Sequence, residues 1–176
     1  MKKMRTFIAA ELPEEAKAHL ASVSEVLAQQ LPPGAVRWVK PEQIHLTLRF
    51  LGETAVVQLP EIISALDEAM GRQAPFTLYL DELGCFPNRK RPRVIWAGLS
   101  GEEAAVARLK RAIDECLVPL GWERETRLFR PHLTLGRVKD ARKLVRVEWG
   151  ASLKQLAMPL AAVCLIESKL TPQGSI

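Results

Sequence analysis

The four letters HLTL occur twice in this chain, at residues 45–48 and again at 132–135. The repeats contain His45 and His132, two of the three histidines among 176 residues, and lie 87 positions apart (132 − 45). In a β-strand, residues i and i+2 share a face. Each repeat is therefore predicted to present its histidine and threonine on one face and its two leucines on the other.

Two such strands brought together would make a site for chemistry at phosphorus. Near pH 7 a neutral imidazole accepts a proton and an imidazolium donates one, so His45 and His132 could activate water and protonate a leaving oxygen. The hydroxyls of Thr47 and Thr134 could donate hydrogen bonds to phosphate oxygens. Each general acid or base contributes about 10²–10⁴-fold, which suits an activated diester such as a strained cyclic phosphate.

A metal site is the main rival to this interpretation. Zinc usually takes three or four ligands at close spacing, but His19 lies beside Leu20 and belongs to no cluster. The three cysteines are widely separated, which argues against a disulfide framework or a zinc knuckle and fits a reducing cytoplasm. We therefore expect no metal and no cofactor. The cysteines are Cys85, Cys116 and Cys164.

Positive charge is unevenly distributed along the chain. The net charge is +5 and the pI about 9.3, and the basic residues gather at 86–94 and at 124–146. Such runs fit a phosphate-bearing partner, although solvated loops explain them as well. No apolar run is long enough to span a membrane, and acidic residues at 11–15 interrupt any signal-peptide core, so export is not expected.

The order of predicted elements indicates an α+β fold of mostly antiparallel sheet, because several strands follow one another without a helix between them. The stretch 140–152 is ambiguous between a short helix and a loop. Strands are predicted at 6–12, 36–40, 44–50, 76–83, 94–99, 132–138 and within 158–170, and helices from Pro13 to Leu31, at 60–71 and at 101–121.

The same order suggests an internal duplication. Each HLTL strand follows an amphipathic helix and then a segment with a tryptophan, Trp38 before the first and Trp122 before the second. We expect one domain over residues 1–176, made of two intertwined lobes that each supply one His-x-Thr motif.

Several longer blocks resemble the 2H phosphoesterase superfamily, which is named for two His-x-Thr/Ser motifs. Among its members the resemblance is to the bacterial and archaeal RNA 2′,3′-cyclic phosphodiesterases, formerly called 2′-5′ RNA ligases, and it covers nearly the whole chain. The matching blocks are RTFIAAELPEE (5–15), VRWVKPEQIHLTLRFLGE (36–53), GCFPNRKRPRVIWAGL (84–99), FRPHLTLGRVK (129–139) and IESKLTPQG (166–174).

The resemblance implies a bilobal fold with pseudo-twofold symmetry, helices outside and both motifs facing a central cleft. It implies metal-independent hydrolysis of RNA 2′,3′-cyclic phosphate ends to 2′-phosphomonoesters. By position, His45 matches the proton donor and His132 the proton acceptor, while Thr47 and Thr134 match the phosphate-holding hydroxyls. Arg130 fits a phosphate contact, since a guanidinium suits phosphate oxygens, with a surface ion pair as its alternative.

Neighbouring residues give further expectations. Arg89, Lys90 and Arg91 are candidates to contact an RNA backbone. Phe50 alternates with the leucines of the first repeat, so we expect it in the core. Gly136 stands where the first repeat has Arg49, so the two halves need not bind phosphate equally.

The chain ends soon after the last matching block, at Ile176, whereas the family often continues with an aromatic-containing strand; we expect a short or missing edge strand. Two alternatives stay open: reversible 2′-5′ RNA joining and cleavage at the same site, or a non-catalytic RNA-binding module. We expect a cytoplasmic monomer without a membrane partner.

Overall fold

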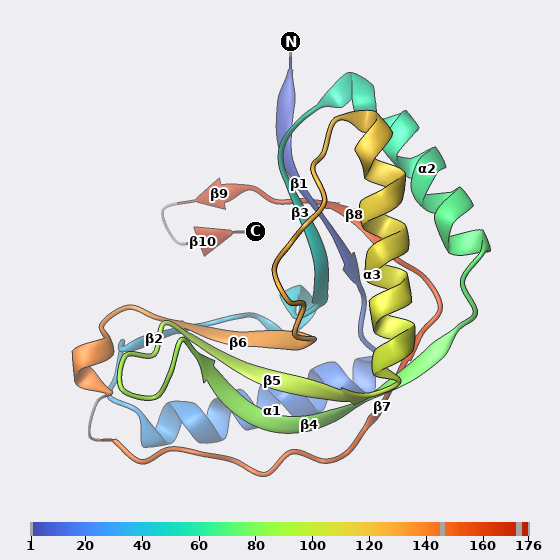
Figure 1. Ribbon diagram of the computed structural model, residues 1–176. Coiled ribbons are helices and arrows are strands. Elements are labelled where there is room, and N and C mark those ends of the chain that lie inside the picture. The colour runs from blue at the N-terminus through green and yellow to red at the C-terminus, as the bar shows by residue number, and fades with distance from the viewer. Residues whose placement is uncertain (1, 145–146, 172–173, 176) are drawn as a thin grey trace.

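Eight strands form one curved antiparallel sheet in the computed structural model, which describes residues 2–144, 147–171 and 174–175 (Figure 1). The α+β class predicted from the sequence is confirmed. The strands are β1 (Lys3–Ala10), β2 (Val36–Trp38), β3 (Leu46–Ala55), β4 (Phe76–Phe86), β5 (Val94–Gly101), β6 (His132–Val138), β7 (Ala157–Leu160) and β8 (Cys164–Glu167), and the helices are α1 (Glu14–Gln30), α2 (Leu59–Gly71) and α3 (Glu103–Leu117).

The strand order is β7-β4-β5-β6-β3-β1-β8, and β2 pairs with β6 beside this path. Figure 1 shows β1 and β3 crossing the direction of β4, β5 and β6, with α2 and α3 beside the first group and α1 along the second. α1 follows β1 in the chain yet contacts β6, and α3 follows β5 yet contacts β3. Each half of the sheet is therefore covered by the helix that follows the other half.

The ladders β1·β3 and β5·β6 repeat each other at an offset of 87 residues. Ala9 pairs with Thr47 in the first ladder. Adding 87 to both numbers gives Trp96 and Thr134, which pair in the second. The duplication suggested by the HLTL repeats thus extends to the partner strands and their register.

A β-bulge follows the threonine of each repeat. Leu48 in β3 and Leu135 in β6 have no partner in these ladders, because the register shifts on either side of them. A bulge re-aims the side chains beyond it. The prediction that Phe50 packs in the core is therefore wrong: beyond the bulge its side chain is 63% exposed, and Leu51 is buried instead.

The amphipathic helices follow their sequence patterns. Ala16, Leu20, Val23 and Leu27 of α1 are buried, as their helical spacing predicts. The acidic Glu14 and Glu15 occupy its first turn, where the helix dipole favours anions. Among the residues described, no helix is long and apolar enough to cross a bilayer.

The C-terminal third differs from the prediction of one final strand at 158–170. Two strands form there, and they lie at opposite edges of the sheet: β7 pairs with β4 and β8 with β1. The edge beside β1 is thus the four-residue β8, and β9 (Leu170–Thr171) pairs with β10 (Gly174–Ser175) in a separate ladder. A 3-10 turn at Ala141–Lys143 falls in the ambiguous stretch; its residues 145–146, and 172–173 of the last matching block, lie outside the described residues.

A substitution at Gly136 would test how closely β2 packs against β6. A methyl group there would lie 2.6 Å from Cγ1 of Val36 and 3.0 Å from the Trp38 ring. We expect Gly136→Ala to lower the free energy of unfolding by about 1–3 kcal/mol, as overpacking does, measured by urea denaturation. Gly71→Ala, with open space around it, is the control and should not destabilise. Equal midpoints for both variants would contradict the packing described.

Candidate active site

The two HLTL repeats lie side by side at the centre of the sheet. β3 and β6 are neighbours, and Leu46 pairs with Leu133. Continuing this antiparallel register by one residue in each direction places the histidine of each repeat opposite the threonine of the other. Residues directly opposite in such a ladder have Cβ atoms about 4.5–5.5 Å apart. Because both leucines are buried, at 2% and 0% exposure, the imidazoles and hydroxyls share the other face.

His132 has a fixed orientation and a fixed tautomer. Its Nδ1 lies 2.7 Å from the backbone carbonyl oxygen of Arg130, and a carbonyl can only accept, so Nδ1 donates. In the neutral ring Nε2 then carries the free lone pair. The Phe86 ring meets the imidazole edge-on at 5.0 Å between centroids, and the Trp96 ring lies at 6.4 Å. His132 can therefore accept a proton at Nε2.

His45 occupies a drier environment. Its ring stacks on Phe7, with centroids 4.7 Å apart and an interplanar angle of 29°. Burial lowers the pKa of His45, while a hydrogen bond to the Gln43 backbone and the charge of Glu11 act in the opposite direction. Each catalytic candidate is thus tied to the backbone two residues before it, at Gln43 and Arg130.

Arg130 is exposed and precedes His132 by two residues. Its carbonyl orients the imidazole, and within the part of the chain described its guanidinium makes no ion pair within 4 Å. The side chain is therefore available to an anion, and the phosphate contact expected of Arg130 stays a prediction.

Phe50 adds an aromatic surface that the sequence did not predict. Its ring centroid lies 5.9 Å from that of Phe7, which in turn stacks on His45. The site face on this side is therefore lined by one buried and one exposed aromatic ring. The bulge at Leu48 turns the Phe50 side chain to this face, and the alternating pattern of the sequence did not predict a bulge there.

Arg49 belongs to an internal charge cluster. Its Nη1 lies 3.6 Å from Asp114 of α3 and 3.4 Å from Glu125, and its Nη2 donates to the carbonyl of Glu123. Lys110 pairs with the same Asp114 at 2.6 Å. Arg49 thus joins β3 to α3 and to the segment leading into β6. At the equivalent position of the second repeat, Gly136 is covered by Trp38. The difference between Arg49 and Gly136 is therefore explained by packing in each half.

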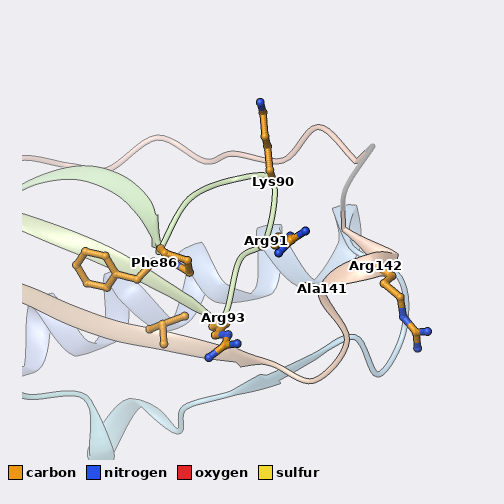
Figure 2. A pocket seen from close by; sticks show the side chains of 8 residues that line it. Phe86, Lys90, Arg91, Arg93, Ala141 and Arg142 are labelled. Atoms are coloured by element: carbon orange, nitrogen blue, oxygen red, sulfur yellow. The ribbon is translucent and has the colours of Figure 1, made fainter.

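A basic hollow of ≈ 980 Å³ adjoins the His132 half of the site (Figure 2). Phe86, whose ring contacts His132, forms one end of it. Arg89 does not line it: its guanidinium stacks on Trp149 at 4.3 Å and donates to that residue's carbonyl at 3.1 Å, so it anchors the loop. The lining residues are Phe86, Pro87, Lys90, Arg91, Arg93, Val94, Ala141 and Arg142.

The described residues contain no group of three or more His, Cys, Asp or Glu side chains placed to hold a metal ion. His19, the third histidine, lies on α1 and accepts a hydrogen bond at Nε2 from the backbone of Lys154. The chemistry that the site can perform with its own side chains is proton transfer and anion binding.

A curved antiparallel sheet with two His-x-Thr repeats on one face defines a phosphoesterase of the two-histidine class, and similarity to known proteins agrees. The model of the LigT like Phosphoesterase family matches residues 10–96 and 99–176. This chain belongs to that family, which confirms the resemblance seen in the sequence.

Individual relatives span the same length. The chain is 32% identical to the RNA 2′,3′-cyclic phosphodiesterase of Methanothermobacter thermautotrophicus, over 99% of this chain and 95% of the relative. The crystal structure of TT0787 of Thermus thermophilus matches with a TM-score of 0.82 and 31% identity, over 98% and 93% of the two chains. Escherichia coli LigT complexed with 3′-AMP matches with a TM-score of 0.69 and 26% identity, over 99% and 94%.

The stacked environment of His45 makes a testable prediction. Because burial lowers its pKa, the ring should lose its proton below the ordinary value of 6.5 and be mostly neutral at pH 7. With three histidines in the chain, an NMR titration assigned with His19→Ala, His45→Ala and His132→Ala reads each ring separately. A midpoint for His45 at or above 6.5 would contradict the environment described.

Proposed function

We propose that this protein hydrolyses RNA 2′,3′-cyclic phosphate ends to 2′-phosphomonoesters by acid–base catalysis between His45 and His132. The observation that carries the proposal is the Leu46·Leu133 pairing, which sets the two His-x-Thr repeats next to each other. The similarity to the RNA 2′,3′-cyclic phosphodiesterase of Methanothermobacter thermautotrophicus supports this choice of substrate. That the protein acts as a cytoplasmic monomer stays a prediction.

In the proposed reaction, Nε2 of His132 takes a proton from water as the water oxygen attacks phosphorus. The bond from phosphorus to the ribose 3′-oxygen breaks, and His45 gives its proton to that oxygen. The hydroxyls of Thr47 and Thr134 donate to the non-bridging oxygens, and Arg130 adds positive charge. The fixed Nδ1–H of His132 supports its role as the base. Because burial lowers the pKa of His45, its ring is a stronger acid when protonated, and only the minority of molecules that carry this proton at pH 7 can donate it.

The aromatic side of the site suits the nucleoside. Proton donation to the 3′-oxygen puts the terminal ribose on the His45 side, where Phe7 and Phe50 lie. Single-stranded RNA bases stack on aromatic side chains. We propose that Phe50 stacks on the terminal base.

The histidines provide the main test. In EDTA, with an oligoribonucleotide ending in a cyclic phosphate, His45→Ala and His132→Ala should each lower kcat by about 10²–10⁴-fold, the usual contribution of a general acid or base. His19→Ala is the matched control and should keep the wild-type rate, because His19 lies on α1 and its Nε2 accepts a hydrogen bond from the backbone of Lys154. Chromatography of the RNA ends gives the rates.

Two outcomes would overturn the proposal. Unchanged rates in both histidine variants would exclude acid–base catalysis by this pair. RNA binding that survives both substitutions, without any turnover in the wild type, would instead support a non-catalytic RNA-binding module.

Phe50 provides a separate prediction. Loss of a stacked base costs about 1–3 kcal/mol, so Phe50→Ala should raise KM for a cyclic nucleotide by about 5- to 150-fold while kcat changes little. Val57→Ala, at another exposed apolar residue, 69% exposed, serves as the control in the same steady-state assay. Equal KM values for wild type and Phe50→Ala would exclude stacking on this ring.

A further inference from the structure

The two repeats are joined in the sheet at a single point. Within the described residues, the ladder between β3 and β6 consists of one pair, Leu46 with Leu133, and the two strands then diverge in direction (Figure 1). One pair sets the register of two strands, but it does not set the angle at which they cross. Other contacts must therefore hold the His132 repeat at a fixed angle to the His45 repeat.

The segment 122–131 provides such contacts. None of its residues, all of which the structure describes, belongs to a helix or a strand, and it runs from the end of α3 past β3 to the start of β6 (Figure 1). The indole N–H of Trp122 donates to the carbonyl oxygen of Leu51 at 3.1 Å. The Nη2 of Arg49 donates to the carbonyl oxygen of Glu123. Two residues of β3 thus bind the beginning of the segment.

Glu125 extends this connection along the segment. Its Oε2 lies 3.4 Å from Nη1 of Arg49, and its Oε1 accepts a long hydrogen bond of 3.5 Å from the backbone N–H of Arg127. Three residues further on, the carbonyl oxygen of Arg130 accepts the bond from Nδ1 of His132. These contacts and the backbone between them form a continuous path from Arg49 in β3 to the imidazole of the proposed base.

The charges around Arg49 are costly to bury. The side chains of Arg49, Asp114 and Lys110 are each 10% exposed, and the Nε of Arg49 is buried without a hydrogen-bond partner among the described residues. Buried ion pairs can often be replaced by apolar residues without loss of stability. The other half of the fold has the apolar arrangement, since Trp38 packs over Gly136 at the equivalent position. Stability alone therefore does not require a cation at this position of β3.

We propose that Arg49 is a positioning residue, which holds the segment 122–131 against β3 and thereby fixes the imidazole of His132. The kinetic consequence of this inference rests on the proposed function. Glu125 transmits the constraint, because one of its carboxylate oxygens contacts Arg49 and the other contacts the backbone of the segment. Without the constraint, the carbonyl of Arg130 moves away from Nδ1, and the ring no longer has one fixed tautomer.

The orientation of His132 can be read directly by NMR. At alkaline pH, where imidazoles are neutral, long-range ¹H–¹⁵N spectra of the wild type should show His132 as the Nδ1–H tautomer alone, because Nδ1 donates to a backbone carbonyl. Arg49→Met and Glu125→Gln should each give a mixture of tautomers at His132, while the signals of His45 stay as in the wild type. A single unchanged tautomer in both variants would overturn the inference.

The same variants are then assayed for hydrolysis of a cyclic nucleotide in EDTA. A displacement of about 1 Å lowers a rate by on the order of 10²-fold, so Arg49→Met should lower kcat between about tenfold and 10²-fold. Glu125→Gln should lower kcat in the same direction. Because both substitutions act through one contact, the double variant should be no slower than Arg49→Met. Additive effects in the double variant would overturn the role of Glu125 in transmitting the constraint.

Two controls change α3 outside this path. Glu115→Gln breaks an exposed ion pair of 3.8 Å with Arg124 of the same segment; such pairs contribute little, so kcat and the tautomer should stay as in the wild type. Lys110→Met removes the buried partner of Asp114, which should lower the Tm but leave kcat and the tautomer unchanged. If Lys110→Met lowered kcat as much as Arg49→Met does, the role of Arg49 would be structural only and the inference would be overturned.

The outcomes distinguish this inference from the proposed function. No hydrolysis by the wild type would overturn the proposed function, and the NMR comparison would still decide the inference. Hydrolysis by the wild type, with an unchanged kcat and a single His132 tautomer in Arg49→Met and Glu125→Gln, would overturn the inference alone. If Arg49→Met does not fold, Glu125→Gln carries both measurements, because the side chain of Glu125 is 38% exposed and its substitution leaves no buried charge in the segment.

Discussion

The site depends on the pairing of Leu46 with Leu133 in the middle of the sheet. This contact fixes the register of β3 against β6, and a slip by one residue would turn the histidines and threonines of one repeat into the core. Burial of both leucines makes such a slip costly. The same apolar contacts that hold the sheet together therefore hold two imidazoles on one face.

Around this pairing the backbone of the two halves is duplicated, but the side chains beside the two histidines differ. Phe7 and Phe50 flank His45, whereas Val94 and Arg137 occupy the equivalent places beside His132. One half is apolar and lowers the pKa of its histidine through burial; the other is cationic and open to a polyanion. A pseudo-symmetric site can thus hold a substrate that is itself unsymmetrical, with a nucleoside on one side of phosphorus and the attacking group on the other.

Much of this arrangement could be predicted from the sequence, because period-two alternation in HLTL assigns faces and helical spacing assigns the buried stripe of α1. The bulges could not be predicted, because no residue type in β3 marks the position where the ladder skips Leu48. The sequence pattern therefore placed Phe50 in the core by mistake. The partners of Arg49 come from α3 and from residues 123–125, which approach only after folding. The split of 158–170 into β7 and β8 depends on the curvature of the whole sheet, which local pattern does not encode.

The most direct test of the central claim is a crystal structure with a bound nucleoside 2′-phosphate, the product of the proposed reaction. The account predicts one phosphate in hydrogen-bond contact with both His45 and His132 and with both threonine hydroxyls, and a base against Phe50. A phosphate bound by one repeat alone, with the other histidine more than a hydrogen bond away, would contradict the claim that the paired repeats form one active site.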